Sequence, residues 1–259
     1  MVMNFQAMSV LLIISVTIIL AATTKLSTAV VQPSPDCKTT CGNLTNINFP
    51  FGMSEECYLD ENFLITCNTT FQPPKGFYRK GNLPVLSISH EAGEMRVQQP
   101  VSRVCYNSSG NRNQNRTMLW EVYSAKFRIS YTHNKFTAVG CETAGLISGP
   151  NYSTGCIAAC NRVENTVNGS CTGVGCCESQ IPRGVNNFSI NAGFVRNHSR
   201  VDRFSPCSYV FLAQEGSYIF NSLDLWNLSR QDQFPIVLDW AVGSVACTDA
   251  IQNESSYAC

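Results

Sequence analysis

The sequence is poor in the features that most enzymes and nucleic-acid-binding proteins need. Charged residues make up 14% of the chain, its 18 basic and 18 acidic side chains cancel, and there are three histidines. Without excess positive charge, the chain lacks the main attraction that drives binding to nucleic acid. No GxSxG, HExxH or protein-kinase signature occurs, and Gly173-Val-Gly175 lies inside a cysteine cluster. We therefore expect no catalytic activity, no metal or other cofactor and no nucleic-acid partner.

Long apolar segments and helical periodicity are also scarce. The uncharged apolar run at residues 7–22 is followed by Ser27-Thr28-Ala29, which is typical of a cleavage site. This pattern predicts a signal peptide over residues 1–29, with an uncleaved anchor as the alternative. After residue 30 no segment has the length and apolar character of a membrane span. Short alternating segments take the place of helices, which predicts a mainly β fold.

Cysteines and glycosylation sequons are abundant, and both predict an extracellular protein. The cysteine count, 14, is even. We expect most of them to be oxidised to disulfides, including Cys37, Cys41, Cys57, Cys67, Cys105, Cys141, Cys156, Cys160, Cys171, Cys176, Cys177 and Cys207. Ten N-x-S/T sequons predict N-glycosylation, at Asn43, Asn68, Asn107, Asn115, Asn151, Asn168, Asn187, Asn197, Asn227 and Asn253.

Residues 140–177 hold six of the cysteines and have almost no apolar periodicity. Such a segment needs covalent links to stay in place. We interpret it as a loop-rich clasp that joins two β-rich subdomains, in which the neighbours Cys176 and Cys177 bond to different partners. The alternative is a zinc site formed by these two residues with Cys156 and Cys160, which an oxidising compartment disfavours.

Alternating apolar residues predict several strands. Residues 85–89 and 95–98 form a hairpin with Met95 and Val97 on one face. Residues 126–131 place Phe127, Ile129 and Tyr131 inward and Ser130 outward, and residues 135–139 return the chain. Further strands are expected at residues 61–68, 181–195, 207–220 and 234–240, while the polar tract 107–117 marks a subdomain boundary.

Basic residues gather in one part of the sequence despite the neutral total. Residues 75–116 carry seven Lys or Arg against two acids, and such a local field attracts anions. Residues 75–80 (KGFYRK) combine cations with aromatic rings, the two residue types that suit an acidic sugar polymer. An ordinary solvated loop with Phe77 buried is the alternative. A second basic window, residues 196–203, carries its own sequon and ranks lower.

Several motifs together resemble the extracellular region of plant wall-associated receptor kinases. In that family a C-x3-CG opening precedes an aromatic PFG turn and a cysteine-bearing strand. The matching residues here are Cys37, Cys41-Gly42, Phe49–Gly52, Cys67, Phe136–Cys141, Gly155–Cys160, Cys171–Cys177, Ile181-Pro182, Val237–Trp240 and Cys247.

The resemblance implies a galacturonan-binding-like module at residues 30–106, a cysteine-rich β region at 107–246 and the start of a growth-factor-like module at 247–259. Because Cys247 and Cys259 resemble the entry to that last module, we expect them to pair with each other or stay free, and the first 12 cysteines to form a closed set of disulfides. It implies binding of de-esterified galacturonan, an acidic pectin, in the cell wall or as a plasma-membrane receptor ectodomain. The alternative is a receptor ectodomain for a protein or peptide. Membrane attachment would then require segments outside these residues. No sequon lies between Lys75 and Arg103, so we expect one cationic face there, formed by Lys75, Arg79, Lys80, Arg96 and Arg103 with Phe77 or Tyr78 as a stacking platform.

Overall fold

The structure is a computed structural model, and it describes residues 34–107, 112–116, 118–121, 126–195, 200–228 and 232–243. Strands dominate these residues, and the short helical segments are η1 (Glu61–Phe63), η2 (Val163–Asn165) and α2 (Asp224–Asn227). The strands are β1 (Ile65–Asn68), β2 (Lys75–Tyr78), β3 (Val85–Ser89), β4 (Glu94–Pro100), β5 (Ser102–Tyr106), β6 (Arg112–Arg116), β7 (Met118–Glu121), β8 (Phe127–Ile129), β9 (Asn134–Val139), β10 (Thr143–Gly149), β11 (Tyr152–Ala158), β12 (Cys176–Gln180), β13 (Asn187–Phe194), β14 (Cys207–Gln214) and β15 (Gln233–Trp240). The predicted mainly β fold is confirmed. None of the described helices has the length and apolar character needed to cross a membrane.

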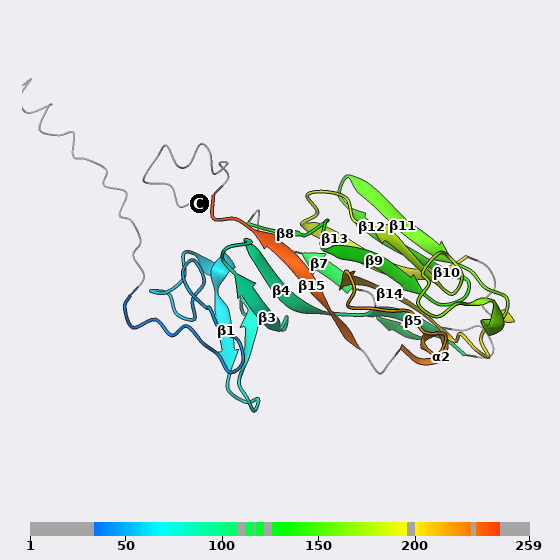
Figure 1. Cartoon of the computed structure of the whole chain (residues 1–259), viewed down its shortest axis with the longest axis horizontal. Helices are drawn as coiled ribbons and strands as arrows, with labels where there is room; N and C mark the ends of the chain where they lie inside the picture. Colours follow the sequence, from blue (N-terminus) through cyan, green and yellow to red (C-terminus); the bar gives the residue numbers. More distant parts are fainter. Residues whose placement is uncertain are drawn as a thin grey trace, which may run out of the picture. The chain divides into compact units, whose positions relative to one another are not determined.

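The strands form antiparallel sheets whose order differs from the order in the chain. The sheet orders are β1-β2, β3-β4-β15-β8, β11-β10-β13-β7 and β12-β9-β14-β5-β6. In Figure 1 the late strand β15 lies between the earlier strands β4 and β8. Pairing therefore joins residues that are more than a hundred positions apart.

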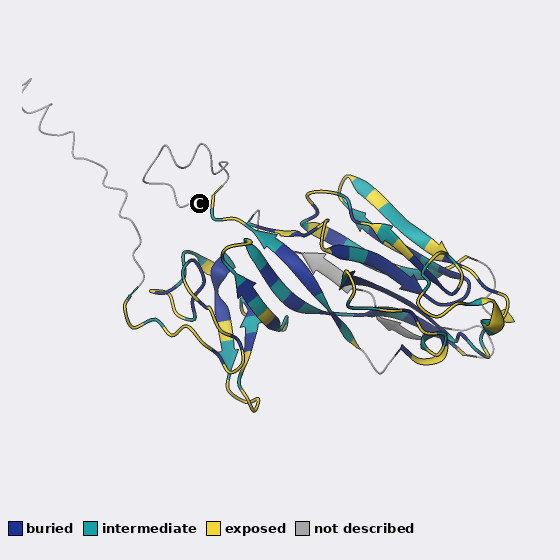
Figure 2. Cartoon of the chain, viewed as in Figure 1, coloured by how far each residue is buried: buried dark blue, intermediate teal, exposed yellow. Residues whose placement is uncertain are grey.

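The β11-β10-β13-β7 sheet packs closely against the β12-β9-β14-β5-β6 sheet. A side chain at Gly145 of β10 would place its Cβ 2.8 Å from the Cβ of Ala138 and 3.2 Å from Phe136 and Val210. Glycine at this position thus lets β10 approach β9 and β14. Figure 2 shows the buried positions following these strands. A second apolar cluster contains Phe211 and Phe234, whose rings stack with centroids 4.2 Å apart.

Local alternation correctly predicted several strands. β3 and β4 pair as the expected hairpin, and Met95 and Val97 are fully buried on its inner face. Phe127 and Ile129 of β8 are buried as well. The last predicted strand, at residues 234–240, corresponds to β15.

Alternation failed where a strand ends earlier than the pattern suggested. β8 ends at Ile129, so Ser130 is fully buried and Tyr131 is exposed, the reverse of the prediction. Ser130 Oγ instead lies 3.2 Å from His133 Nδ1 in the turn that follows. The predicted strand at residues 135–139 is present as β9, which pairs with β12 and β14 rather than with β8.

The segment predicted to be a loop-rich clasp contains two seven-residue strands instead, β10 and β11, which pair along their full length. Glycines dilute its apolar pattern, yet they permit close packing of the sheets. The polar tract 107–117 includes β6, which pairs with β5. Residues 61–63 begin the predicted 61–68 strand as a 3-10 helix. The predicted strand at 181–195 is reduced to β13, and the strand predicted at 207–220 ends at Gln214.

Six disulfides join the first 12 cysteines, as predicted. The pairs are Cys37–Cys57, Cys41–Cys67, Cys105–Cys207, Cys141–Cys160, Cys156–Cys177 and Cys171–Cys176. The neighbours Cys176 and Cys177 do bond to different partners. The zinc alternative fails because its four sulfur atoms are all in disulfides. Cys247 and Cys259 lie outside the described residues.

The described residues from Ser34 onward form one compact unit. β4, from the first predicted module, pairs with β15 from the second. Strand pairing therefore crosses the predicted boundary between the two subdomains. The domain boundaries remain a prediction. The predicted signal peptide lies outside the described residues.

Candidate functional site

The β1–β2 hairpin carries the basic and aromatic residues that the sequence singled out. Along β2, Lys75 is exposed and Phe77 half-buried, whereas Gly76 and Tyr78 are buried. Successive side chains on a strand point to opposite faces, so Lys75 and Phe77 share the outer face. A Cβ at Gly76 would lie 2.5 Å from the Leu44 side chain, which explains why the inner face has glycine here.

Lys75 and Phe77 meet an aromatic residue that sequence reasoning missed. The Phe71 and Phe77 ring centroids are 5.8 Å apart, and Lys75 Nζ lies 4.7 Å from the Phe71 centroid. Phe71 is 38% exposed, which is unusual for a phenylalanine. The three side chains form an exposed surface of ring and cation, which we call the hairpin platform. The available signal was Phe71 directly before Gln72-Pro73-Pro74 in a turn.

Tyr78, the other proposed stacking residue, belongs to the core. It is 8% exposed, and its ring centroid lies 5.0 Å from that of Phe127. Its hydroxyl is buried without a hydrogen-bond partner, and burial raises the pKa of this phenol. Tyr78 thus cannot stack on a ligand, and Phe77 is the residue that faces outward.

Arg79 and Lys80 follow β2 at the start of the next turn. Arg79 has a left-handed backbone with φ of 54°; its N–H donates to Leu64 O and its carbonyl accepts from Thr66 Oγ1. Lys80 Nζ lies 3.7 Å from Glu61 Oε1, in an ion pair in which both side chains are well exposed. Such pairs contribute little to stability and leave the lysine accessible.

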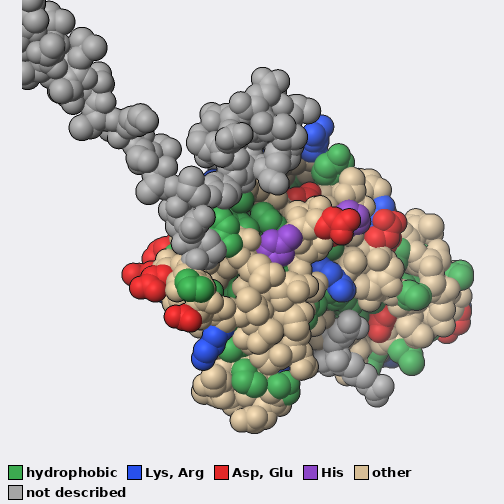
Figure 3. Space-filling model, turned by 60° about the vertical axis from the view of Figure 1, so that its left-hand side comes forward, with side chains coloured by type: hydrophobic (Ala, Val, Ile, Leu, Met, Phe, Trp, Pro, Cys, Tyr) green, Lys and Arg blue, Asp and Glu red, His purple; other side chains and the backbone are tan. Residues whose placement is uncertain are grey.

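The remaining predicted cations lie in other strands. Arg96 of β4 donates from Nε to Gln214 Oε1 at 2.9 Å, and Arg103 of β5 lies 3.9 Å from Asp232 Oδ1. In Figure 3 the basic side chains on the visible face lie apart, and acidic ones gather beside them. The structure thus groups Lys75 with the two phenylalanines, while a single cationic face that includes Arg96 and Arg103 remains a prediction.

One sequon lies directly beside the hairpin platform. Asn68 of β1 is the cross-strand partner of Lys75, although it lies seven positions away in sequence. Its Oδ1 accepts hydrogen bonds from the Thr70 N–H at 2.9 Å and Oγ1 at 2.7 Å. A glycan on Asn68 would therefore start beside Lys75. The absence of a sequon between Lys75 and Arg103 in the sequence therefore does not keep this surface free of sequons in the folded chain.

The other sequons that the structure describes fit glycan attachment. Asn43, Asn107, Asn151, Asn168, Asn187 and Asn227 are exposed, and Asn68 is half-buried. The side chains of Asn115, Asn197 and Asn253 lie outside the described residues. Their use as glycosylation sites remains a prediction.

A small group of polar residues has the composition of a cation site. One ligand atom from each of Glu94, His133 and Asp239 lies within 4.8 Å of the others. His133 Nδ1 is 3.1 Å from Glu94 Oε1, so the imidazole and the carboxyl group already contact each other directly. Burial raises the pKa of Asp239. We assign no metal to this group.

Comparison with known proteins gives consistent matches. Residues 37–99 match the family described as wall-associated receptor kinase galacturonan-binding. Wall-associated receptor kinase 2 of Arabidopsis thaliana is 41% identical over 225 residues, which cover 83% of this chain and 29% of that protein. Wall-associated receptor kinase 3 of the same plant is 36% identical over 253 residues, 91% of this chain and 33% of that protein.

The chain spans about a third or less of the length of these relatives. No solved structure matches it. The hairpin platform lies within the matched residues 37–99. The chain is therefore a relative of the wall-associated receptor kinases. Its residues 37–99 match the family described as their galacturonan-binding region.

Proposed function

We propose that this chain is an extracellular module of the plant cell wall or plasma-membrane surface, and that it binds de-esterified galacturonan through the hairpin platform. The observation that carries the proposal is the exposed group of Phe71, Lys75 and Phe77. It lies in the region that matches the galacturonan-binding family.

The chemistry of the platform suits an acidic polysaccharide. Galacturonan has one carboxylate per sugar, which pairs with lysine, and the apolar faces of its sugar rings pack on aromatic side chains. Among the described residues, Lys75 has no acidic partner within 4 Å, so its charge is available. Single exposed charges contribute about 0–1 kcal/mol each. Affinity therefore requires several contacts along the polymer, and Lys80 and Arg79 are the nearest further cations in sequence.

The test compares binding of the secreted chain to de-esterified and fully methyl-esterified oligogalacturonides by calorimetry. We expect binding to the de-esterified form alone, and weaker binding as salt rises, because salt screens exposed charges. The double variant Lys75→Glu/Lys80→Glu should lose about 1–2 kcal/mol, or roughly five- to thirty-fold in affinity. We leave Arg79 unchanged because its backbone bonds and positive φ make it a poor residue to replace.

The matched control is Arg162→Glu/Arg183→Glu, which changes the formal charge equally at two exposed residues outside the matched region. It should bind as the parent does. Equal losses in both double variants would mean that overall charge matters rather than the platform. Absence of binding to any oligogalacturonide, with binding to a peptide or partner ectodomain, would favour the alternative function.

A further inference from the structure

The segment after β14 exposes three large apolar side chains. Ile219, Leu223 and Trp226 are 73%, 76% and 60% exposed. Scattered apolar residues on a surface are ordinary, but these three line one hollow of about 630 Å³. A grouped apolar surface of this kind usually has an occupant.

The segment after β14 is packed against the core through other side chains. The Tyr218 ring packs edge-on against Phe211 and Phe234, with centroids 5.1 Å and 5.4 Å away. Leu225, in the middle of α2, is fully buried. The exposure of Trp226 and its neighbours is therefore a property of a folded surface.

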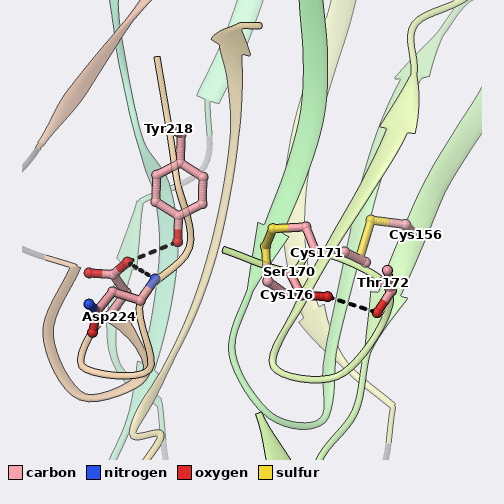
Figure 4. The surroundings of a disulfide bond; sticks show 9 residues. Cys156, Ser170, Cys171, Thr172, Cys176, Tyr218 and Asp224 are labelled. Carbon is pink, nitrogen blue, oxygen red and sulfur yellow. Dashed lines mark hydrogen bonds between the residues drawn. A yellow bond between two sulfur atoms is a disulfide. The ribbon is translucent and has the colours of Figure 1, made fainter. Parts of the chain in front are cut away.

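The hollow also has polar groups. Tyr218 donates from its hydroxyl to Asp224 Oδ2, and the Asn221 N–H donates to the same oxygen, each at 3.0 Å. Figure 4 shows these bonds converging on Asp224, the first residue of α2. An exposed indole beside a fixed carboxylate and amides is suited to a sugar, which has both apolar ring faces and hydroxyl groups.

One sequon lies at this hollow, and a second contacts a residue next to it in sequence. Asn227 lines it and directly follows Trp226. Asn168, from the distant segment before β12, accepts a hydrogen bond from the Ser222 N–H through Oδ1 at 2.8 Å. Both asparagines are exposed. A glycan is attached through the side-chain nitrogen, so this bond to the oxygen of Asn168 is compatible with glycosylation.

We propose that the inner sugars of an N-glycan on Asn227 lie over Trp226 and fill this hollow. Attachment one residue away holds these sugars at a high effective concentration, on the order of millimolar or more, so weak stacking suffices. The sugars thus cover the apolar surface, and a protein partner is kept away from it. This inference is independent of the galacturonan site.

The test uses secreted, glycosylated protein and begins with glycopeptide mass spectrometry at Asn227, where we expect occupancy. The variant Asn227→Gln then removes the sugar while Trp226 stays. We expect stronger acrylamide quenching of the tryptophan emission, a red shift of that emission and greater binding of the dye ANS. Introducing Trp226→Phe into both proteins should abolish the difference in quenching, which assigns it to Trp226 rather than to the other two tryptophans.

The control is Asn43→Gln, which removes an exposed sequon at a different site and should leave Trp226 quenching unchanged. Equal thermal unfolding of parent and variants shows that the fold is intact. An unoccupied Asn227 would overturn the proposal. So would an occupied Asn227 whose removal leaves quenching and ANS binding as in the parent, because the surface would then be open and available to another partner.

Discussion

Asn134 provides a sharp test of how the sheets are held together. It is fully buried at the start of β9. Its Nδ2 donates to Ser130 O at 2.7 Å and to Val237 O at 2.8 Å, and its Oδ1 accepts from the Val237 N–H at 2.8 Å. One side chain thus links the five-stranded sheet to β15 of another sheet and to the turn after β8.

The variant Asn134→Ala should be strongly destabilised. Val237 O keeps a bond from the Ser130 N–H, but the Val237 N–H and the Ser130 carbonyl lose the Asn134 partner. A buried polar group left unsatisfied costs about 1–3 kcal/mol, so two such groups cost about 2–6 kcal/mol. Since domains of this kind are stable by about 5–15 kcal/mol, this loss is a large fraction of the total.

The measurement is urea unfolding of the oxidised protein, followed by fluorescence and circular dichroism. The matched control is Asn191→Ala on β13, where an exposed asparagine donates to Ser189 Oγ at 3.2 Å. It should change the free energy of unfolding by less than about 0.5 kcal/mol. A loss below about 1 kcal/mol for Asn134→Ala, with an unchanged slope, would refute the assigned role.

Two further predictions concern the hairpin and the disulfides. Asn68→Gln should raise affinity for de-esterified galacturonan if Asn68 is glycosylated, because Lys75 lies directly across the hairpin; unchanged calorimetric affinity despite measured occupancy would contradict this. Replacing both cysteines of Cys105–Cys207 with serine should destabilise more than the same change in Cys171–Cys176, because their separations are 102 and 5 residues. Loop-closure entropy predicts costs of about 4.7 and about 2 kcal/mol, and calorimetric unfolding that ranks the two variants the other way would exclude a loop-length explanation.

The local pattern of apolar residues was enough to predict some strands but not their partners. Met95 and Val97 alternate with polar residues, and a strand buried on one face requires that pattern. Nothing near β4 in sequence indicates that β15 pairs with it. That choice depends on which surfaces fit when the chain is folded. The same reason explains the error at Ser130 and Tyr131, where contacts with a turn ended the strand.

The candidate site was likewise predicted only in part from the sequence. Lys75 and Phe77 were predicted from their residue types, and their alternate positions in β2 place them on one face. Phe71 and Asn68 were not connected with them, because proximity across a hairpin is a property of the strand register. Tyr78 was wrongly assigned to the ligand face, because sequence alone does not distinguish an aromatic residue in the core from one on the surface.

By itself, the sequence determined that the chain is β-rich and linked by disulfides, since strand alternation and a high, even cysteine count are properties of composition and spacing. The family resemblance added that the first 12 cysteines pair among themselves. The tertiary structure decided which cysteines meet, which strands are neighbours and which aromatic residues face solvent. These depend on contacts between residues far apart in the chain, whose energies arise only when complementary surfaces pack together.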